Sequence, residues 1–110
     1  MAYVPERGDV VWLEFDPSAG HEQAGHRPAF VISPQAYNKA NGMMICCPMT
    51  TKIKGYPFEV VFTAPDGTQS AVLSDQVKSL DWVARKAKYR YTADPAVFTE
   101  ARAKMAVLFR

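Results

Sequence analysis

The segment from His21 to Pro28 gathers side chains that can transfer protons and bind phosphate. It reads His21-Glu22-Gln23-Ala24-Gly25-His26-Arg27-Pro28, so a carboxylate, two imidazoles and a guanidinium lie within eight residues. Carboxylates and imidazoles can exchange protons near neutral pH, whereas the planar donors of a guanidinium match phosphate oxygens in pairs. This composition favours proton transfer at a phosphate group, although an ordinary solvated loop is the alternative interpretation.

A second polar cluster follows an apolar run at residues 43–47. It reads Pro48-Met49-Thr50-Thr51-Lys52-Ile53-Lys54-Gly55. If the strands that carry Arg27 and Thr50 are neighbours in one sheet, the two clusters converge on one site. The sequence does not by itself establish that pairing, and two unrelated surface loops remain possible.

Signatures of cofactor and metal sites are missing from the sequence. There is no glycine loop of the phosphate-binding kind, and His21 and His26 lack a cysteine pair at metal-ligand spacing. Cys46 and Cys47 are adjacent, and adjacent strand residues point to opposite faces, so we expect no disulfide between them. We therefore expect no metal, no cofactor and two buried, reduced thiols.

Length and composition predict one globular domain over residues 1–110. The chain is 48% hydrophobic and 22% charged, which is ordinary for a folded protein of this size. No stretch approaches the roughly 20 apolar residues of a membrane span, and the first residues have no apolar signal core. We expect a soluble, cytoplasmic protein without a membrane partner.

The formal charge of +2 is too small to indicate a nucleic-acid binder, but its distribution is uneven. The densest positive window is Arg85-Lys86-Ala87-Lys88-Tyr89-Arg90-Tyr91. Cations interleaved with aromatic rings suit single-stranded nucleic acid, but charge also protects exposed strand edges. The aromatic residues Trp12, Tyr56 and Phe58 lie at strand spacing and are interpreted as core.

Short β-forming stretches separated by turn residues predict a mainly β fold. We expect strands at 9–15, 29–32, 43–47, 58–62 and 70–73, and a more ambiguous extended segment at 76–84. Asp66-Gly67 is typical of a hairpin turn. Residues 16–27 are expected to form a long polar loop, and a helical turn is expected to end near Lys39.

The last segment predicts one long helix. Asp94 is suited to the N-cap and Pro95 to the first helical position. An apolar stripe follows at helical spacing, formed by Phe98, Ala101, Met105, Leu108 and Phe109. Several short strands and one packed helix indicate a strongly bent antiparallel sheet or an SH3-like barrel.

Four motifs in the same order resemble those of the MazF family, the ribonuclease toxins of bacterial toxin–antitoxin pairs, which are similar also to PemK and Kid. They are Glu22-Gln23-Ala24-Gly25-His26-Arg27-Pro28, Pro48-Met49-Thr50-Thr51, Lys54-Gly55-Tyr56-Pro57-Phe58-Glu59-Val60 and Asp75-Gln76-Val77-Lys78-Ser79. The resemblance runs from Gly8 through the final helix, and residues 85–91 follow the family least closely.

The resemblance implies a small SH3-like β-barrel of the MazF/CcdB type with a C-terminal helix. It also implies a homodimer that cleaves single-stranded RNA at short sequence motifs, as an mRNA interferase that inhibits growth. A cognate MazE-like antitoxin would block it with a disordered tail. Arg27 and Thr50 match the family's catalytic pair, and Glu22 and His26 match loop positions near the reacting phosphate.

Metal-independent cleavage of RNA can use the substrate's own 2′-OH as nucleophile, which leaves a 2′,3′-cyclic phosphate and a 5′-OH. Arg27 then fits charge stabilisation, Thr50 can donate one hydrogen bond, and Glu22 or His26 is expected to be the base. Further RNA contacts are expected from Gln23, Thr51, Lys54 and Lys78, although either lysine is equally well explained as a solvated charge.

Two other classes of function remain open. CcdB-type toxins resemble this family in fold and poison gyrase by binding it, so fold alone does not exclude a non-catalytic toxin. A barrel that binds single-stranded nucleic acid without cutting it is the second alternative. The pair of Arg27 and Thr50 beside an acidic loop favours the nuclease, because a pure binder does not need it.

Overall fold

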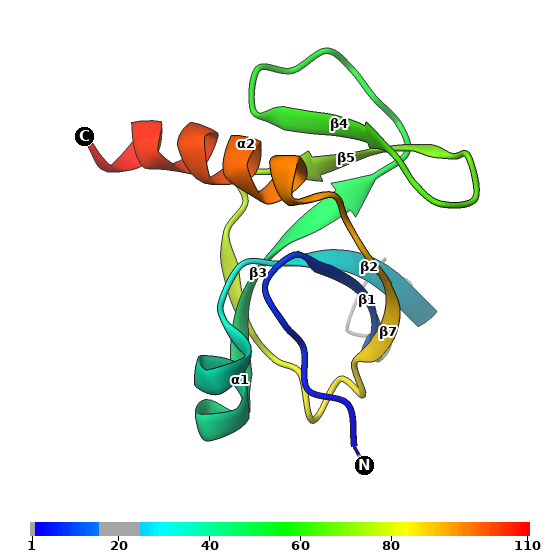
Figure 1. The fold of residues 1–110 in the computed structure, drawn as a ribbon, viewed down its shortest axis with the longest axis vertical. Helices are drawn as coiled ribbons and strands as arrows, with labels where there is room; N and C mark the ends of the chain where they lie inside the picture. The colour runs from blue at the N-terminus through cyan, green and yellow to red at the C-terminus, as the bar shows by residue number, and fades with distance from the viewer. Residues whose placement is uncertain (1, 16–24) are drawn as a thin grey trace, which may run out of the picture.

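The computed structural model describes residues 2–15 and 25–110, which form a mainly β fold with two helices (Figure 1). In chain order the elements are β1 (Asp9–Phe15), β2 (Gly25–Val31), α1 (Gln35–Asn41), β3 (Met43–Thr50), β4 (Glu59–Thr63), β5 (Gln69–Leu73), β6 (Lys78–Asp81), β7 (Lys88–Thr92) and α2 (Pro95–Ala106). A short 3₁₀ turn, Val107–Phe109, follows α2. Each predicted strand is present, and the ambiguous segment at 76–84 contains β6.

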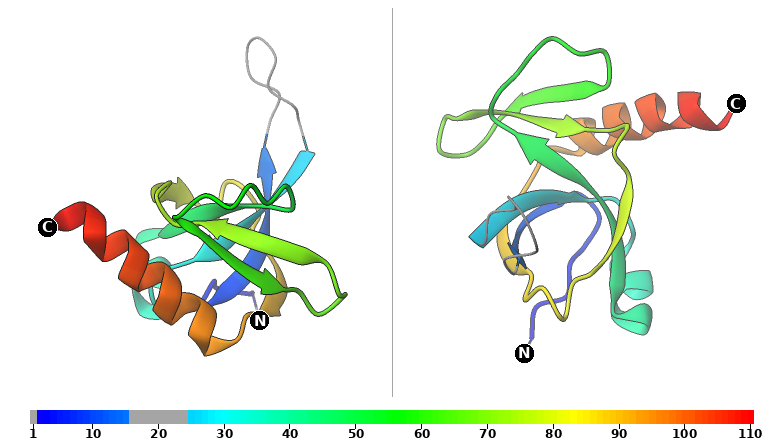
Figure 2. Two further views of the ribbon diagram at one scale, coloured as in Figure 1. Left: turned by 90° about the horizontal axis from the view of Figure 1, so that it is seen from above. Right: turned by 180° about the vertical axis from the view of Figure 1, so that it is seen from behind.

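The strands of the described residues form a curled antiparallel sheet in the order β4-β5-β3-β2-β1-β7. Strand β3 connects the two ends of this sheet (Figure 2). Residues 43–46 pair with β6 and residues 46–48 with β2, whereas Met49 and Thr50 at its end pair with β5. The prediction of a strongly bent sheet with a C-terminal helix is confirmed, and β3 continues three residues beyond the predicted run.

Both faces of the central strands are buried, each in its own apolar cluster. One cluster contains Val10, Phe30 and Cys47 and is covered by α2. The other contains Val11, Leu13 and Cys46 on the opposite face. The adjacent cysteines are free and buried, one in each cluster, as the alternation of strand side chains predicts.

The predicted end of the polar loop is wrong, because β2 begins at Gly25 and not near Ala29. His26, Arg27 and Pro28 lie opposite Glu14, Leu13 and Trp12 of β1. Pairing with β1 therefore extends the strand despite its polar side chains. Pairing with β3 begins only at Ala29, so Pro28 is paired on one side alone, with β1. A proline, which has no backbone N–H to donate, is tolerated at such an edge position. Residues 16–24 of the predicted loop lie outside the described residues.

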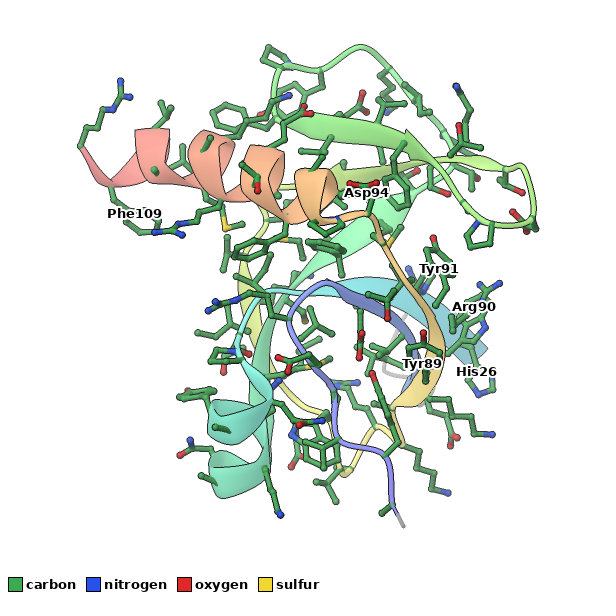
Figure 3. The ribbon with its side chains drawn as sticks, viewed as in Figure 1. His26, Tyr89, Arg90, Tyr91, Asp94 and Phe109 are labelled. Carbon is green, nitrogen blue, oxygen red and sulfur yellow. The ribbon has the colours of Figure 1, made fainter. Side chains whose placement is uncertain are left out.

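Helix α2 begins as predicted, with the Asp94 carboxylate accepting a hydrogen bond from the Ala96 N–H at 2.9 Å. Its buried residues are Val97, Ala101 and Met105. The C-terminal end of the predicted apolar stripe is wrong, because Phe109 is 80% exposed and Leu108 is 48% exposed. The helix extends past the sheet, so Phe109 lies far from the strands (Figure 3).

Candidate active site

A cleft of about 450 Å³ opens between the β1–β2 strands, the end of β3 and the β4–β5 hairpin. Its wall combines cationic, hydroxyl and aromatic side chains. They include His26 from β2, Thr50 from β3, Thr51 and Lys52 just after it, and Trp12 and Arg90 from β1 and β7. The fold thus brings two predicted site residues, His26 and Thr50, to the same cleft.

Thr50 is the last residue of β3 and is half-buried. Its backbone is held by pairing with Ala71 of β5. Its hydroxyl oxygen accepts a hydrogen bond from the Lys52 N–H at 3.0 Å. Because that bond uses an acceptor lone pair, the hydroxyl hydrogen stays available as a donor to a bound phosphate.

His26 projects from β2 with a side chain that is 47% exposed. Its Nε2 atom lies 3.9 Å from a carboxylate oxygen of Glu14, the residue opposite it on β1. Its ring meets the Trp12 indole edge-on, with centroids 6.2 Å apart. These neighbours orient the imidazole and leave it open to solvent, which suits a group that exchanges protons with a substrate.

Arg27 follows His26 on β2, so the two side chains leave opposite faces of the strand. The strand pairing that convergence with Thr50 requires is confirmed, since β2 and β3 are antiparallel neighbours. Arg27 lies two residues before Ala29, and Thr50 lies two residues after Pro48, the last paired positions of these strands. Both residues therefore lie just beyond the paired part of the two strands, and Arg27 does not line the cleft described above.

A second cleft of about 500 Å³ lies on the other side of Thr50 and contains Lys54 and Tyr56. The buried carboxylate of Glu59 organises its rim. It accepts hydrogen bonds from the backbone N–H groups of Lys54, Gly55 and Tyr56. Gly55 has a φ of 76°, which few other residues adopt readily, so this turn depends on glycine.

The rim is closed by a contact between Tyr56 and Asp75. The Tyr56 hydroxyl donates a hydrogen bond of 2.6 Å to the Asp75 carboxylate. That bond raises the pKa of the Tyr56 phenol, so the phenol remains a neutral donor. Asp75, which the sequence placed in a family motif, thus fixes the loop that carries Lys54.

Lys78 is not brought to either cleft. It lies on β6 opposite Cys46, four residues before Thr50 on β3, which corresponds to roughly 13 Å along a strand. Its exposed side chain fits the solvated-charge interpretation equally well. Glu22 and Gln23, the remaining predicted site residues, lie outside the described residues.

Trp12 and Arg90 are among the residues of the first cleft that were not predicted as part of the site. Trp12 was assigned to the core, yet it is half-buried and lines the cleft. The Arg90 guanidinium lies over its ring, 4.3 Å from the centroid. The sequence did contain a signal for Trp12. It shares one strand face with Val10 and Glu14, and a charged residue on that face indicates partial exposure to solvent and not a fully buried core.

Among the residues that the structure describes, no group of three or more His, Cys, Asp or Glu side chains lies close enough together to hold a metal ion. The same residues contain no helix that is long and apolar enough to cross a membrane.

Comparison with known proteins gives one consistent relationship. The family model described as PemK-like, MazF-like toxin of type II toxin–antitoxin system matches residues 6–109. The chain is 50% identical over 106 residues to the endoribonuclease toxin MazF of Escherichia coli K12, covering 96% of this chain and 95% of that one. It is 41% identical over 103 residues to the endoribonuclease toxin ChpB of the same strain, with 87% and 86% covered.

Solved structures agree with this relationship. The chain matches a crystal structure of MazE–MazF from Deinococcus radiodurans with a TM-score of 0.90 and 49% identity, over 98% of this chain and 97% of the other. A crystal structure of MazF from the same organism matches with a TM-score of 0.85 and 49% identity, over 98% of both chains.

Proposed function

The chain belongs to the PemK-like, MazF-like toxins of type II toxin–antitoxin systems, and we propose that it is the endoribonuclease of such a pair, cleaving single-stranded RNA at a specific sequence. One observation carries this proposal beyond family membership. His26 and Thr50 both line one cleft, so an imidazole and a hydroxyl donor open onto the same space. That combination suits a phosphodiester whose cleavage needs proton transfer and stabilisation of charge.

The proposed reaction uses the 2′-OH of the substrate as nucleophile and needs no metal ion. The 2′ oxygen attacks the adjacent phosphorus, the bond to the 5′ oxygen breaks, and the products are a 2′,3′-cyclic phosphate and a 5′-OH. Thr50 donates a hydrogen bond to a phosphate oxygen. Arg27, which leaves the other face of β2 from His26, is proposed to approach the phosphorane from outside the first cleft and to stabilise its negative charge. Arg27 does not act as the base, because a guanidinium stays protonated at neutral pH.

Glu22 or His26 removes the 2′ proton in this mechanism, and the other is suited to protonating the leaving oxygen. Glu14 supports the role of His26 by position, because its carboxylate lies 3.9 Å from the Nε2 atom and helps to orient the ring. The pair is solvent-exposed, so this support is modest. Positioned acid–base groups contribute about 10²- to 10⁴-fold to such a reaction.

RNA on either side of the cut is proposed to run through the two clefts that flank Thr50. Thr51 lies in the first cleft and Lys54 in the second, so both can contact phosphates near the reacting one. Gln23 and Lys78 are proposed to contact more distant nucleotides. Backbone contacts of this kind make the affinity for RNA dependent on salt concentration.

The proposed partners follow from the same family. The MazE–MazF crystal structure from Deinococcus radiodurans supports a MazE-like antitoxin as the inhibitor of this chain. We also propose that the toxin acts as a homodimer in the cytoplasm, where its RNA substrate is found. The buried free thiols of Cys46 and Cys47 are in keeping with that reducing compartment. The gyrase-binding alternative is disfavoured, because the matched relatives named above are endoribonucleases.

The test incubates the purified protein with mixed-sequence single-stranded RNA in excess EDTA and maps the ends of the products. Wild type, Arg27→Ala and the matched control Arg102→Ala are compared, since Arg102 is an exposed arginine on α2, outside both clefts. Cleavage by wild type and control alone, leaving cyclic phosphate ends, is the expected result. Absence of cleavage by wild type on RNA that contains most short motifs would contradict the nuclease and lead to a gyrase assay.

A further inference from the structure

Arg90 occupies an irregular position in the sheet. Val10 of β1 lies opposite Tyr91 of β7, but the next residue, Val11, lies opposite Tyr89. Arg90 is therefore an extra residue on β7, the arrangement of a β-bulge. A bulge bends its strand and re-aims the side chain of the extra residue, which is why bulges recur beside active sites.

The bulge directs Arg90 into the first cleft. Its guanidinium carbon lies over the Trp12 ring at 4.3 Å from the centroid, and the same ring makes a T-shaped contact with the imidazole of His26. Figure 3 shows Arg90 and His26 projecting to the same side of the molecule from different strands. A cation, an indole and an imidazole thus line one wall of the cleft that also holds Thr50.

Edge protection alone does not account for this arrangement. A charge that only protects an edge strand points into solvent, as the exposed Lys88 on the same strand can do. Arg90 is exposed as well, but its guanidinium covers an aromatic face that lines a cleft. It forms no ion pair within 4 Å among residues 2–15 and 25–110. Asp66 also lines the cleft, however, and hydrogen bonds from Thr68, together with the charge of Arg90, lower the pKa of its carboxyl. A second cation, Lys52, lines the same cleft.

We propose that the stacked side chains of Arg90 and Trp12 form a specificity-determining subsite for one unpaired nucleotide of the RNA, next to the bond that is cut. A guanidinium stacked on an indole keeps its N–H donors in the plane, free to pair with acceptors on a base edge or a phosphate. An unpaired base offers both a π-face for stacking and an edge for hydrogen bonds. This inference rests on the proposed function and names residues that select the cleavage motif.

The cleft itself favours a nucleotide over a segment of an acidic protein. Its volume of about 450 Å³ lies in the range of sites that enclose a small ligand. The stack shares the cleft with Thr50 and His26, so a base bound there belongs to a nucleotide close to the reacting phosphate. An acidic peptide would need cations but not a guanidinium already stacked on an aromatic ring.

The test compares cleavage profiles on a fully degenerate RNA library. Product ends are sequenced for wild type, Arg90→Lys and Arg90→Gln, with Arg102→Gln as a control of equal charge change on α2. Arg90→Lys keeps the charge but loses the planar stack, so we expect the preference at one nucleotide position to flatten about tenfold. The other positions of the motif and the cyclic phosphate ends stay as in wild type, and Arg102→Gln keeps the full profile.

Binding of an uncleavable 2′-deoxy oligonucleotide of mixed sequence separates this inference from the nuclease itself, because it needs no motif from cleavage. Arg90→Gln and Trp12→Leu are expected to weaken binding about tenfold, and circular dichroism checks that both variants fold. Weakened binding with no cleavage by wild type would support the subsite while overturning the nuclease. Cleavage by wild type with an unchanged motif in both Arg90 variants would overturn the subsite. A loss of affinity confined to an antitoxin peptide would assign the cleft to that partner and overturn it too.

Discussion

The carboxylate of Asp9 accepts a hydrogen bond of 2.9 Å from the hydroxyl of Thr92, 83 residues later in the chain. Asp9 is 5% exposed and also accepts hydrogen bonds from the Tyr3 hydroxyl and the Glu6 N–H. This one side chain joins the N-terminal segment, the start of β1 and the end of β7. It therefore holds the strand whose bulge aims Arg90.

Asp9→Ala is expected to lower the free energy of unfolding by about 2–3 kcal/mol, because it removes hydrogen bonds to a buried charge and leaves polar partners unpaired. Thr92→Val removes one of the three bonds and is expected to cost about 1 kcal/mol. Urea denaturation measures both. Asp81→Ala is the control, since the exposed Asp81 accepts a single bond from the Ala84 N–H. An equal loss in Asp9→Ala and Asp81→Ala would contradict the anchoring role.

Replacing both candidate bases, in Glu22→Gln with His26→Gln, is expected to reduce the rate of RNA cleavage by about 10²- to 10⁴-fold. Single-turnover cleavage measures this rate apart from product release. Each single variant is expected to lose less than the pair if the other group partly takes over. Near-normal turnover of the double variant would refute the assignment of the base to either residue.

Glu59→Gln is expected to destabilise the rim of the second cleft, because a neutral amide is a weaker acceptor for three backbone N–H groups than a carboxylate. We expect a loss of about 1–2 kcal/mol in unfolding free energy and weaker RNA binding through displacement of Lys54. Thermal denaturation and oligonucleotide titration measure the two effects. The control is Glu100→Gln, which breaks an exposed pair with Lys104 at 3.1 Å and should cost less than about 0.5 kcal/mol. Unchanged RNA affinity in Glu59→Gln would show that the rim does not position Lys54 on RNA.

Local patterns predicted a large part of the fold. The β-forming run of β1, the apolar run that begins β3, the Asp66-Gly67 hairpin and the Asp94 N-cap depend on neighbouring residues, and all are present. Features set by distant partners were missed. His26 to Pro28 form a strand because β1 lies beside them, and Phe109 is exposed because the sheet ends before the helix does.

The same distinction applies to the site. His26 and Thr50 are marked in the sequence by polar clusters and by family motifs, and the pairing of β2 with β3 brings their strands together. Arg90 was marked only as one cation of the positive window at residues 85–91, for which edge protection was the alternative interpretation. Its role depends on a shift of register between β7 and β1, and composition contains no information about register. Trp12 was misassigned for the same reason, since its environment includes a side chain 78 positions away.

The two thiols predict how stability responds to alkaline pH. Burial raises the pKa of the Cys46 thiol from 9.0 to about 11, and burial together with the neighbouring Cys46 raises that of Cys47 to about 12. Above pH 9 the unfolded chain loses these protons while the folded protein keeps them, so unfolding becomes more favourable as pH rises. Burial and Asp9 also raise the pKa of Tyr3, which acts in the same direction at higher pH.

Urea denaturation from pH 8 to pH 10.5 is therefore expected to show a declining free energy of unfolding. The limiting slope is about 1.4 kcal/mol per pH unit for each thiol. Native protein at pH 8 should react with a thiol reagent only as fast as it opens, and denatured protein at once. A flat stability profile, or rapid modification of the native protein, would contradict the burial of these groups.

The pairing of β7 with β1 also gives the parts of the site an order of appearance during synthesis. Strand β1 emerges early from the ribosome, but its partner Thr92 follows 83 residues later. At 5–20 residues per second this is a delay of roughly 4 to 17 seconds. A nascent chain interrupted before β7 already contains His26 and Thr50 but lacks Arg90 and the anchor for β1. The cleft wall that Arg90 supplies is thus translated after His26 and Thr50, and a newly made toxin acquires it later than those two residues.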